Sequence, residues 1–68
     1  MKNSIRVERA IQRISQEQLA EKVGASRQTI NAIELVKYIP SGLIMMKIAA
    51  VFGKSVNDIF ELEDSDWE

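Results

Sequence analysis

The chain has 68 residues and contains neither cysteine nor histidine. That length allows one small domain. The missing residue types exclude disulfides, cysteine-based or histidine-based metal sites, and catalysis by histidine. No run of about 18 apolar residues and no signal-peptide pattern occurs. We therefore expect a soluble, cytoplasmic protein that binds no metal and is not attached to a membrane.

Charge is distributed unevenly, although the formal net charge is only -1. Residues 1–60 contain all nine lysines and arginines and five of the ten acidic residues, a net charge of +4. The last eight residues contain the other five acids and no base. A modestly basic body is compatible with nucleic-acid binding but does not argue for it alone. We expect a domain over residues 1–62 and an acidic tail over residues 63–68.

A first helix is predicted after Asn3 or Ser4, either of which can cap its N-terminus. Four apolar residues then recur at helical spacing and predict one apolar face: Val7, Ala10, Ile11 and Ile14. Three arginines share a flank of this helix: Arg6, Arg9 and Arg13. They form a solvated basic face, or one of them contacts a phosphate, or Arg9 makes an internal ion pair.

The stretch from Ser15 to Glu34 predicts two short helices joined by a tight turn. Ser15 and Gln18 have the spacing of a capping box, in which each side chain bonds the backbone N–H of the other residue. Gly24 can adopt the positive φ that ends a helix in a left-handed turn. Ser26 follows as a second cap. Two short helices around a glycine-containing turn are typical of a helix-turn-helix unit.

The second of these two helices, the third in the chain, has distinct inner and outer sides. Ile30 and Ile33 continue the apolar stripe. The outward side carries hydrogen-bonding residues: Arg27, Gln28, Thr29 and Asn31. This side either contacts DNA or is the ordinary exposed side of a helix in a bundle.

Pro40 biases Ile39 toward an extended conformation, so the third helix must end before this point. Lys37 and Tyr38 then lie in a loop, where they are either phosphate ligands or ordinary polar loop residues.

A fourth helix is predicted over residues 43–52, opened by Ser41 or Gly42 and closed by Gly53. One side is assigned to the core: Met45, Ile48, Ala49 and Phe52. The opposite side is also apolar and continues into the residues before the helix, so another molecule should largely cover it. We expect a dimer interface there: Leu35, Val36, Ile39, Leu43, Met46 and Ala50. The alternative is a scatter of exposed apolar residues, which is common.

A last short helix is capped by Ser55, with Asp58 as the second member of a capping box. Its inward residues are predicted to be Val56, Ile59 and Phe60. In the acidic tail, Leu62 and Trp67 are available to anchor the chain on the body or on a partner.

The segment SQEQLAEKVGASRQTINAIE resembles the helix-turn-helix of lambdoid phage repressors and of small Xre-type regulators. The resemblance continues through KYIPS, KIAAVFG and NDIFELE, and so covers nearly the whole chain. It implies an all-α fold, a compact five-helix bundle like that of lambda repressor. It also implies that the third helix, Ser26 to Glu34, lies in the major groove of double-stranded DNA and that the protein binds as a dimer.

The resemblance also implies roles for individual residues. Gln16 matches a phosphate-binding glutamine at the N-terminus of the second helix, where free N–H groups and the helix dipole attract anions. The positions that face DNA are Ser26, Arg27, Gln28, Thr29 and Asn31. Arg9 and Glu34 match an ion pair that joins the first helix to the end of the third.

The chain departs from the pattern of this family at several positions, among them Met45 and Met46, which are often Ala, Leu or Phe in relatives. Many relatives carry a glycine shortly after the glutamate, where this chain has Leu35 and Val36. The third helix is therefore expected either to run longer or to end less cleanly. Gly42 stands where an apolar or β-branched residue is usual, which should weaken the start of the fourth helix.

These observations predict a sequence-specific DNA-binding transcriptional regulator, a repressor that binds a two-fold operator as a homodimer. No cofactor and no enzymatic activity are expected. The alternative is a protein-interaction module, for example an antitoxin-like protein that uses the apolar surface around residues 35–46. The acidic tail is either a solvated segment or a screen between the basic body and nonspecific DNA.

Overall fold

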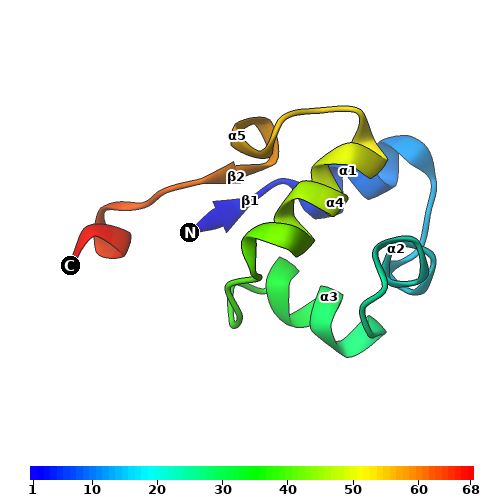
Figure 1. Cartoon of the computed structure of the whole chain (residues 1–68), viewed down its shortest axis with the longest axis horizontal. Coiled ribbons are helices and arrows are strands. Elements are labelled where there is room, and N and C mark those ends of the chain that lie inside the picture. The colour runs from blue at the N-terminus through cyan, green and yellow to red at the C-terminus, as the bar shows by residue number, and fades with distance from the viewer.

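Five α-helices form the body of the protein, with α4 running across the others (Figure 1). The computed structural model describes residues 1–68. In chain order the elements are β1 (Lys2–Asn3), α1 (Ile5–Gln12), α2 (Gln16–Val23), α3 (Arg27–Glu34), α4 (Gly42–Phe52), α5 (Val56–Ile59), β2 (Phe60–Glu61) and a 3-10 turn, η1 (Asp64–Trp67). The predicted all-α, five-helix bundle is confirmed. The longest helix, α4, has 11 residues. None of the helices combines the length and the apolar character that a membrane-spanning segment needs.

The limits of the helices follow from short-range signals in the sequence. The Ser15–Gln18 capping box is present at the start of α2. The hydroxyl of Ser41 accepts a hydrogen bond from the backbone N–H of Ile44 and caps α4, so Gly42 stands inside a capped first turn. Gly24 ends α2 in the left-handed conformation, as predicted, and Gly53, which was predicted to close α4, has the same conformation. These local groups satisfy backbone amides and carbonyls that a helix cannot satisfy itself.

The core receives apolar side chains from every helix and from β2. Six side chains are almost fully buried: Ile5, Leu19, Val23, Ile30, Ile33 and Ile48. Ala49 and Phe52 of α4 are also buried, and Met45 is partly buried against them, so the predicted inner side of α4 is confirmed. Burying one such large side chain contributes about 1.5–3 kcal/mol to folding.

The predicted apolar face of α1 is wrong for Val7, Ala10 and Ile11, although its fourth member, Ile14, packs partly buried against the core. Val7 is 59% exposed, Ile11 is 68% exposed, and Ala10 is also at the surface. The inward residues are instead Ile5 and Glu8. Glu8 tolerates burial because its carboxylate accepts a hydrogen bond from Lys54 Nζ at 2.8 Å, and a buried charge needs such a partner.

A two-stranded antiparallel sheet, which the sequence analysis did not predict, joins the two ends of the chain. Lys2 pairs with Glu61 and Asn3 with Phe60. Beyond it the tail projects away from the body (Figure 1). Leu62 and Trp67 are mostly exposed, so they do not anchor the tail on the body; anchoring on a partner stays a prediction. Polar groups hold the tail instead: the amino group of Met1 contacts Asp66 and Glu63.

The end of α3 is sharp, contrary to expectation. Lys37 N–H donates to the carbonyl of Ala32, and Val36 N–H donates to the carbonyl of Ile33. These two bonds form a Schellman motif, which usually has glycine in its left-handed position. Here Val36 occupies that position, with a φ of +59°. The helix therefore ends in this motif without a glycine, at a cost in backbone strain.

Candidate DNA-reading surface

One side of α3 is polar and open to solvent. Arg27, Gln28 and Asn31 are exposed on it, while Ile30 and Ile33 are buried on the other side. The helix is held against the body by its apolar side, so its polar side is available along its length. This division into two sides agrees with the sequence pattern.

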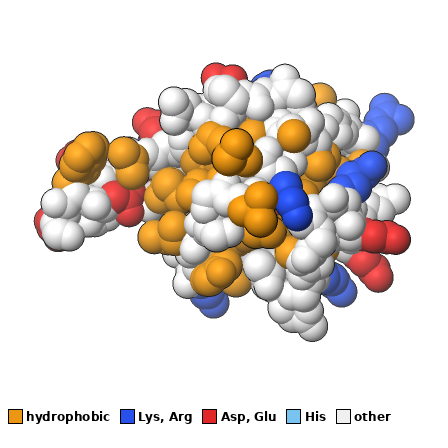
Figure 2. Space-filling model, viewed as in Figure 1, with side chains coloured by type: hydrophobic (Ala, Val, Ile, Leu, Met, Phe, Trp, Pro, Cys, Tyr) orange, Lys and Arg blue, Asp and Glu red, His pale blue; other side chains and the backbone are white.

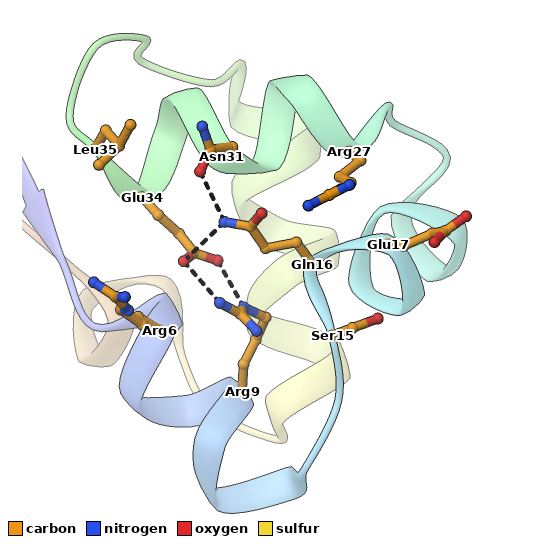
Figure 3. Close-up of a pocket in the computed structure, with 9 residues that line it drawn as sticks. All are labelled: Arg6, Arg9, Ser15, Gln16, Glu17, Arg27, Asn31, Glu34 and Leu35. Atoms are coloured by element: carbon orange, nitrogen blue, oxygen red, sulfur yellow. Dashed lines mark hydrogen bonds and ion pairs between the residues drawn. The ribbon is translucent and has the colours of Figure 1, made fainter.

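A shallow polar hollow lies between this side of α3, the start of α2 and α1 (Figure 3). Only one of its nine lining residues is apolar. They are Arg6, Arg9, Ser15, Gln16, Glu17, Arg27, Asn31, Glu34 and Leu35. A smaller hollow beside it is lined by Gln16, Arg27, Gln28 and Asn31. The structure therefore brings together residues from three helices that are far apart in the sequence.

At the base of this region Arg9 and Glu34 form a two-pronged ion pair. Arg9 Nε donates to Glu34 Oε2 at 2.7 Å, and Arg9 Nη2 donates to Glu34 Oε1 at 3.0 Å. The side chains are only 15% and 6% exposed. Hydrogen bonding to Glu34 raises the pKa of Arg9 above its usual value. A third nitrogen, Nη1, donates to the carbonyl of Ile14 at 3.1 Å, so one guanidinium joins α1, α3 and the segment before α2.

Gln16 contacts α3 through its side chain. Its Nε2 donates to Asn31 Oδ1 at 3.0 Å and to Glu34 Oε1 at 3.4 Å (Figure 3). The amide nitrogen is therefore already engaged within the protein. A phosphate at this end of α2 would meet the backbone N–H groups of the first helical turn, which have no partner within the helix.

Ser26 and Thr29 are occupied at the start of α3. The Ser26 hydroxyl accepts the backbone N–H of Thr29 at 3.1 Å, and the two hydroxyls share a hydrogen bond of 2.8 Å. Ser26 is thus the predicted N-cap. These groups retain one hydroxyl hydrogen between them for another acceptor.

The remaining predicted residues lie after α3. Lys37 and Tyr38 are exposed in the loop and do not line the hollow. The six residues of the predicted dimer interface are all exposed. Apolar side chains gather over α4 and the loop that leads to it (Figure 2). We call the six residues of the predicted dimer interface the apolar patch: Leu35, Val36, Ile39, Leu43, Met46 and Ala50.

Sequence reasoning missed two contacts that fix α3. Asn3 Nδ2 donates to the carbonyl of Ile33 at 2.9 Å, while its Oδ1 accepts the N–H of Ile5 at 3.2 Å. The other missed contact is the bond between Gln16 and Asn31. No local spacing connects residues 15 or 30 positions apart, so only the tertiary structure reveals them.

Residues 5–59 match the model of a helix-turn-helix family. The chain belongs to this family. The HTH-type transcriptional regulator MJ0272 of Methanocaldococcus jannaschii is 50% identical over 66 residues, which cover 97% of this chain and all of that protein. The regulator YgzD of Bacillus subtilis is 45% identical, covering 94% of this chain and 97% of its own. A regulator of Archaeoglobus fulgidus is 42% identical, covering 97% and 94%.

The predicted Xre-type helix-turn-helix family is thereby confirmed. Each of these relatives is named as a transcriptional regulator, and they match this chain over almost their full lengths. The protein is thus a helix-turn-helix transcriptional regulator, and DNA is the partner expected of it. Its α2 and α3 are the two helices of the motif.

Proposed function

We propose that this helix-turn-helix protein is a sequence-specific repressor that binds a two-fold operator as a homodimer. In this proposal α3 lies in the major groove and blocks the operator sterically. Arg27, Gln28 and Asn31 contact base edges. Ser26 and Thr29, at the start of the helix, lie beside the sugar-phosphate backbone of the DNA. The first turn of α2 at Gln16, together with Lys37 and Tyr38, contacts phosphates and fixes the register. No catalytic step and no cofactor is involved.

One observation carries this proposal: a row of exposed hydrogen-bonding side chains stands on a helix whose other side is buried. Gln28 suits adenine N6 and N7, and Arg27 suits guanine O6 and N7. The partly buried Arg9–Glu34 pair supports the proposal further, because it holds the far end of α3 against α1. A reading helix held in this way loses little conformational freedom on binding.

The direct test uses Arg27→Ala and Gln28→Ala in gel shifts with the DNA upstream of the protein's own gene. Each true base contact should contribute about 1–3 kcal/mol of discrimination between the right and the wrong base. Affinity should also fall steeply as salt rises, because phosphate contacts release counterions. If both variants keep full specificity, α3 is not the reader.

The homodimer rests on the apolar patch. Its members are exposed in the single chain, and a helix that is apolar on both sides is usually covered on both. Met46→Glu should lower both self-association and operator affinity, because it puts a charge into the proposed interface. Ile11→Glu is the matched control, since Ile11 is 68% exposed and Met46 is 65% exposed, yet Ile11 lies on α1 outside the patch. A monomer at high micromolar concentration in light scattering would overturn the homodimer.

The same patch favours a second candidate function, a protein-interaction module of the antitoxin-like kind. Here the patch would bind a different protein, and DNA binding would be secondary or absent. Light scattering without DNA, followed by the salt dependence of DNA binding, separates the two. Self-association with steep salt dependence supports the repressor, whereas a monomer without DNA affinity supports the module.

A further inference from the structure

The side chain of Gln16 connects Glu34 with Asn31, which lies one turn earlier on the exposed side of α3 (Figure 3). A glutamine amide has a donating end and an accepting end that look alike in shape, and the same holds for asparagine. The chemistry of the neighbouring groups must therefore decide which end of each amide faces the other.

The ion pair of Arg9 and Glu34 determines the orientation of the Gln16 amide. Glu34 is held by two hydrogen bonds from a guanidinium and is 6% exposed. Its carboxylate is ionised in such a pair and can only accept hydrogen bonds. The atom of Gln16 beside it must therefore be the nitrogen. Because the same nitrogen also faces Asn31, Asn31 must present its oxygen to Gln16.

This orientation determines which hydrogen-bonding group Asn31 presents to DNA. With its oxygen turned toward Gln16, Asn31 points its NH2 group away from Gln16, so the NH2 group is the end that it presents to DNA (Figure 3). A free asparagine binds adenine through two bonds, accepting from N6 and donating to N7. A donor alone suits guanine, which presents O6 and N7, or thymine, which presents O4. It is opposed by the N6 donor of adenine and the N4 donor of cytosine.

We infer that Arg9, Glu34 and Gln16 together set Asn31 as a hydrogen-bond donor, and that α3 therefore prefers guanine or thymine at the base that Asn31 meets. This inference rests on the proposed function, since it requires α3 to read bases. Arg9, Glu34 and Gln16 are positioning residues in this scheme. They determine what Asn31 recognises without touching the base themselves.

The decisive variant is Gln16→Glu. A carboxylate at this position accepts hydrogen bonds, so it should attract the NH2 group of Asn31 and turn its oxygen toward the DNA. Preference should then move to adenine or cytosine. Gln16→Leu is the second variant, because it avoids placing a carboxylate beside Glu34. It leaves the Asn31 amide free to turn. Of the four bases, adenine should then show the largest increase in enrichment.

Gln18→Glu is the matched control. It makes the same chemical change on the same helix, and Gln18 is exposed and serves the capping box, where glutamate is equally suitable. It should leave base preference unchanged. Melting curves from circular dichroism establish that each variant is folded before its DNA preference is compared.

The measurement is selection of bound duplexes from a random pool by the intact chain and its variants. Asn31→Ala identifies the position in question as the one where preference is lost. There the native protein should enrich guanine or thymine. Gln16→Glu should raise the ratio of adenine and cytosine to guanine and thymine at that position by about tenfold. Enrichment of adenine or cytosine by the native protein overturns the inference. So does an unchanged profile in both Gln16 variants, or in Asn31→Ala.

Failure of the inference is distinguishable from failure of the proposed function. If the native protein selects a clear site but the Gln16 variants do not alter it, the function stands and the inference falls. If the native protein enriches no sequence at all, the proposed function itself is wrong and the inference falls with it.

Discussion

Val36 adopts a left-handed backbone conformation that β-branched residues rarely take. A non-glycine residue there costs about 1–2 kcal/mol, while a glycine loses more entropy on folding, about 0.4–1 kcal/mol. We therefore expect Val36→Gly to stabilise the monomer by up to about 1 kcal/mol. Urea denaturation of both proteins at the same low micromolar concentration measures this difference.

Val36→Ala is the control for that experiment. It removes the branched methyl groups of a residue that is 47% exposed, but it keeps a Cβ and hence most of the backbone strain. It should therefore gain less than Val36→Gly. A glycine variant that is less stable than the native chain would show that the valine side chain contributes more than its strain costs.

Asp58 gives the fold a predictable dependence on acid. Hydrogen bonds from the hydroxyl and backbone amide of Ser55 lower the pKa of Asp58. A carboxyl group with a lowered pKa stabilises the folded state above its unfolded pKa, and this contribution is lost as the pH falls through the folded pKa. We expect Asp58→Asn to reduce Tm at pH 7 and the difference from the native chain to shrink below about pH 4. Thermal melts between pH 7 and pH 2 test this, and a difference that is constant with pH would contradict it.

At the scale of the element, α3 is held at its C-terminal end by two groups from the N-terminal part of the chain. Arg9 binds Glu34, and Asn3 binds the carbonyl of Ile33. Replacing only one member of a buried ion pair leaves an unpaired charge and costs about 3–5 kcal/mol. We therefore expect Glu34→Leu to destabilise the protein strongly, as measured by urea denaturation.

The double variant Arg9→Met with Glu34→Leu should recover much of that loss, because apolar residues of similar size can replace a buried pair at little cost. Lys2→Met is a control for the removal of a basic residue, since Lys2 pairs with Glu61 at the surface and such pairs contribute little. If the double variant is as unstable as the single one, the unpaired charge is not the cause.

The sequence predicted those parts of the elements that depend on near neighbours. The caps at Ser15, Ser26 and Ser41 and the left-handed glycines at 24 and 53 follow from groups within four residues of one another. The inner side of α4 and the outer side of α3 follow from helical periodicity. These signals located the helix-turn-helix and the residues on its exposed side.

Two features that the sequence analysis predicted wrongly or missed depend on groups that are distant in the sequence. The orientation of α1 was wrong because Glu8 is buried by virtue of Lys54, 46 positions away. The sheet between β1 and β2 has strands of two residues, too short for an alternating pattern to be visible. The sharp end of α3 was missed for a different reason, because Val36 takes a left-handed conformation that its own preference opposes. The turn is closed by local backbone hydrogen bonds, from Val36 to Ile33 and from Lys37 to Ala32.

At the scale of the molecule, the acidic tail projects from a body of opposite charge (Figure 2). We propose that residues 63–68 screen the body of residues 1–62 from nonspecific DNA. Deleting them should raise affinity for random duplexes several-fold at low salt and much less at 1 M salt, where charges are screened within about 3 Å. Fluorescence anisotropy with a labelled random duplex measures the change.

A tail with its acids replaced by the corresponding amides is the control, because it keeps the length of the chain and removes only charge. It should behave like the deletion. Unchanged nonspecific affinity in both variants would mean that the tail does not act on DNA binding.

In the proposed complex, two copies of α3 read a two-fold DNA site. Selection of bound duplexes from a random pool by the native protein tests it most directly. We predict an inverted repeat whose half-sites have centres about one helical turn apart, 10–10.5 base pairs, or a multiple of it, and whose enrichment is lost with Arg27→Ala or Gln28→Ala. A single site without symmetry, or no enriched sequence, would contradict it.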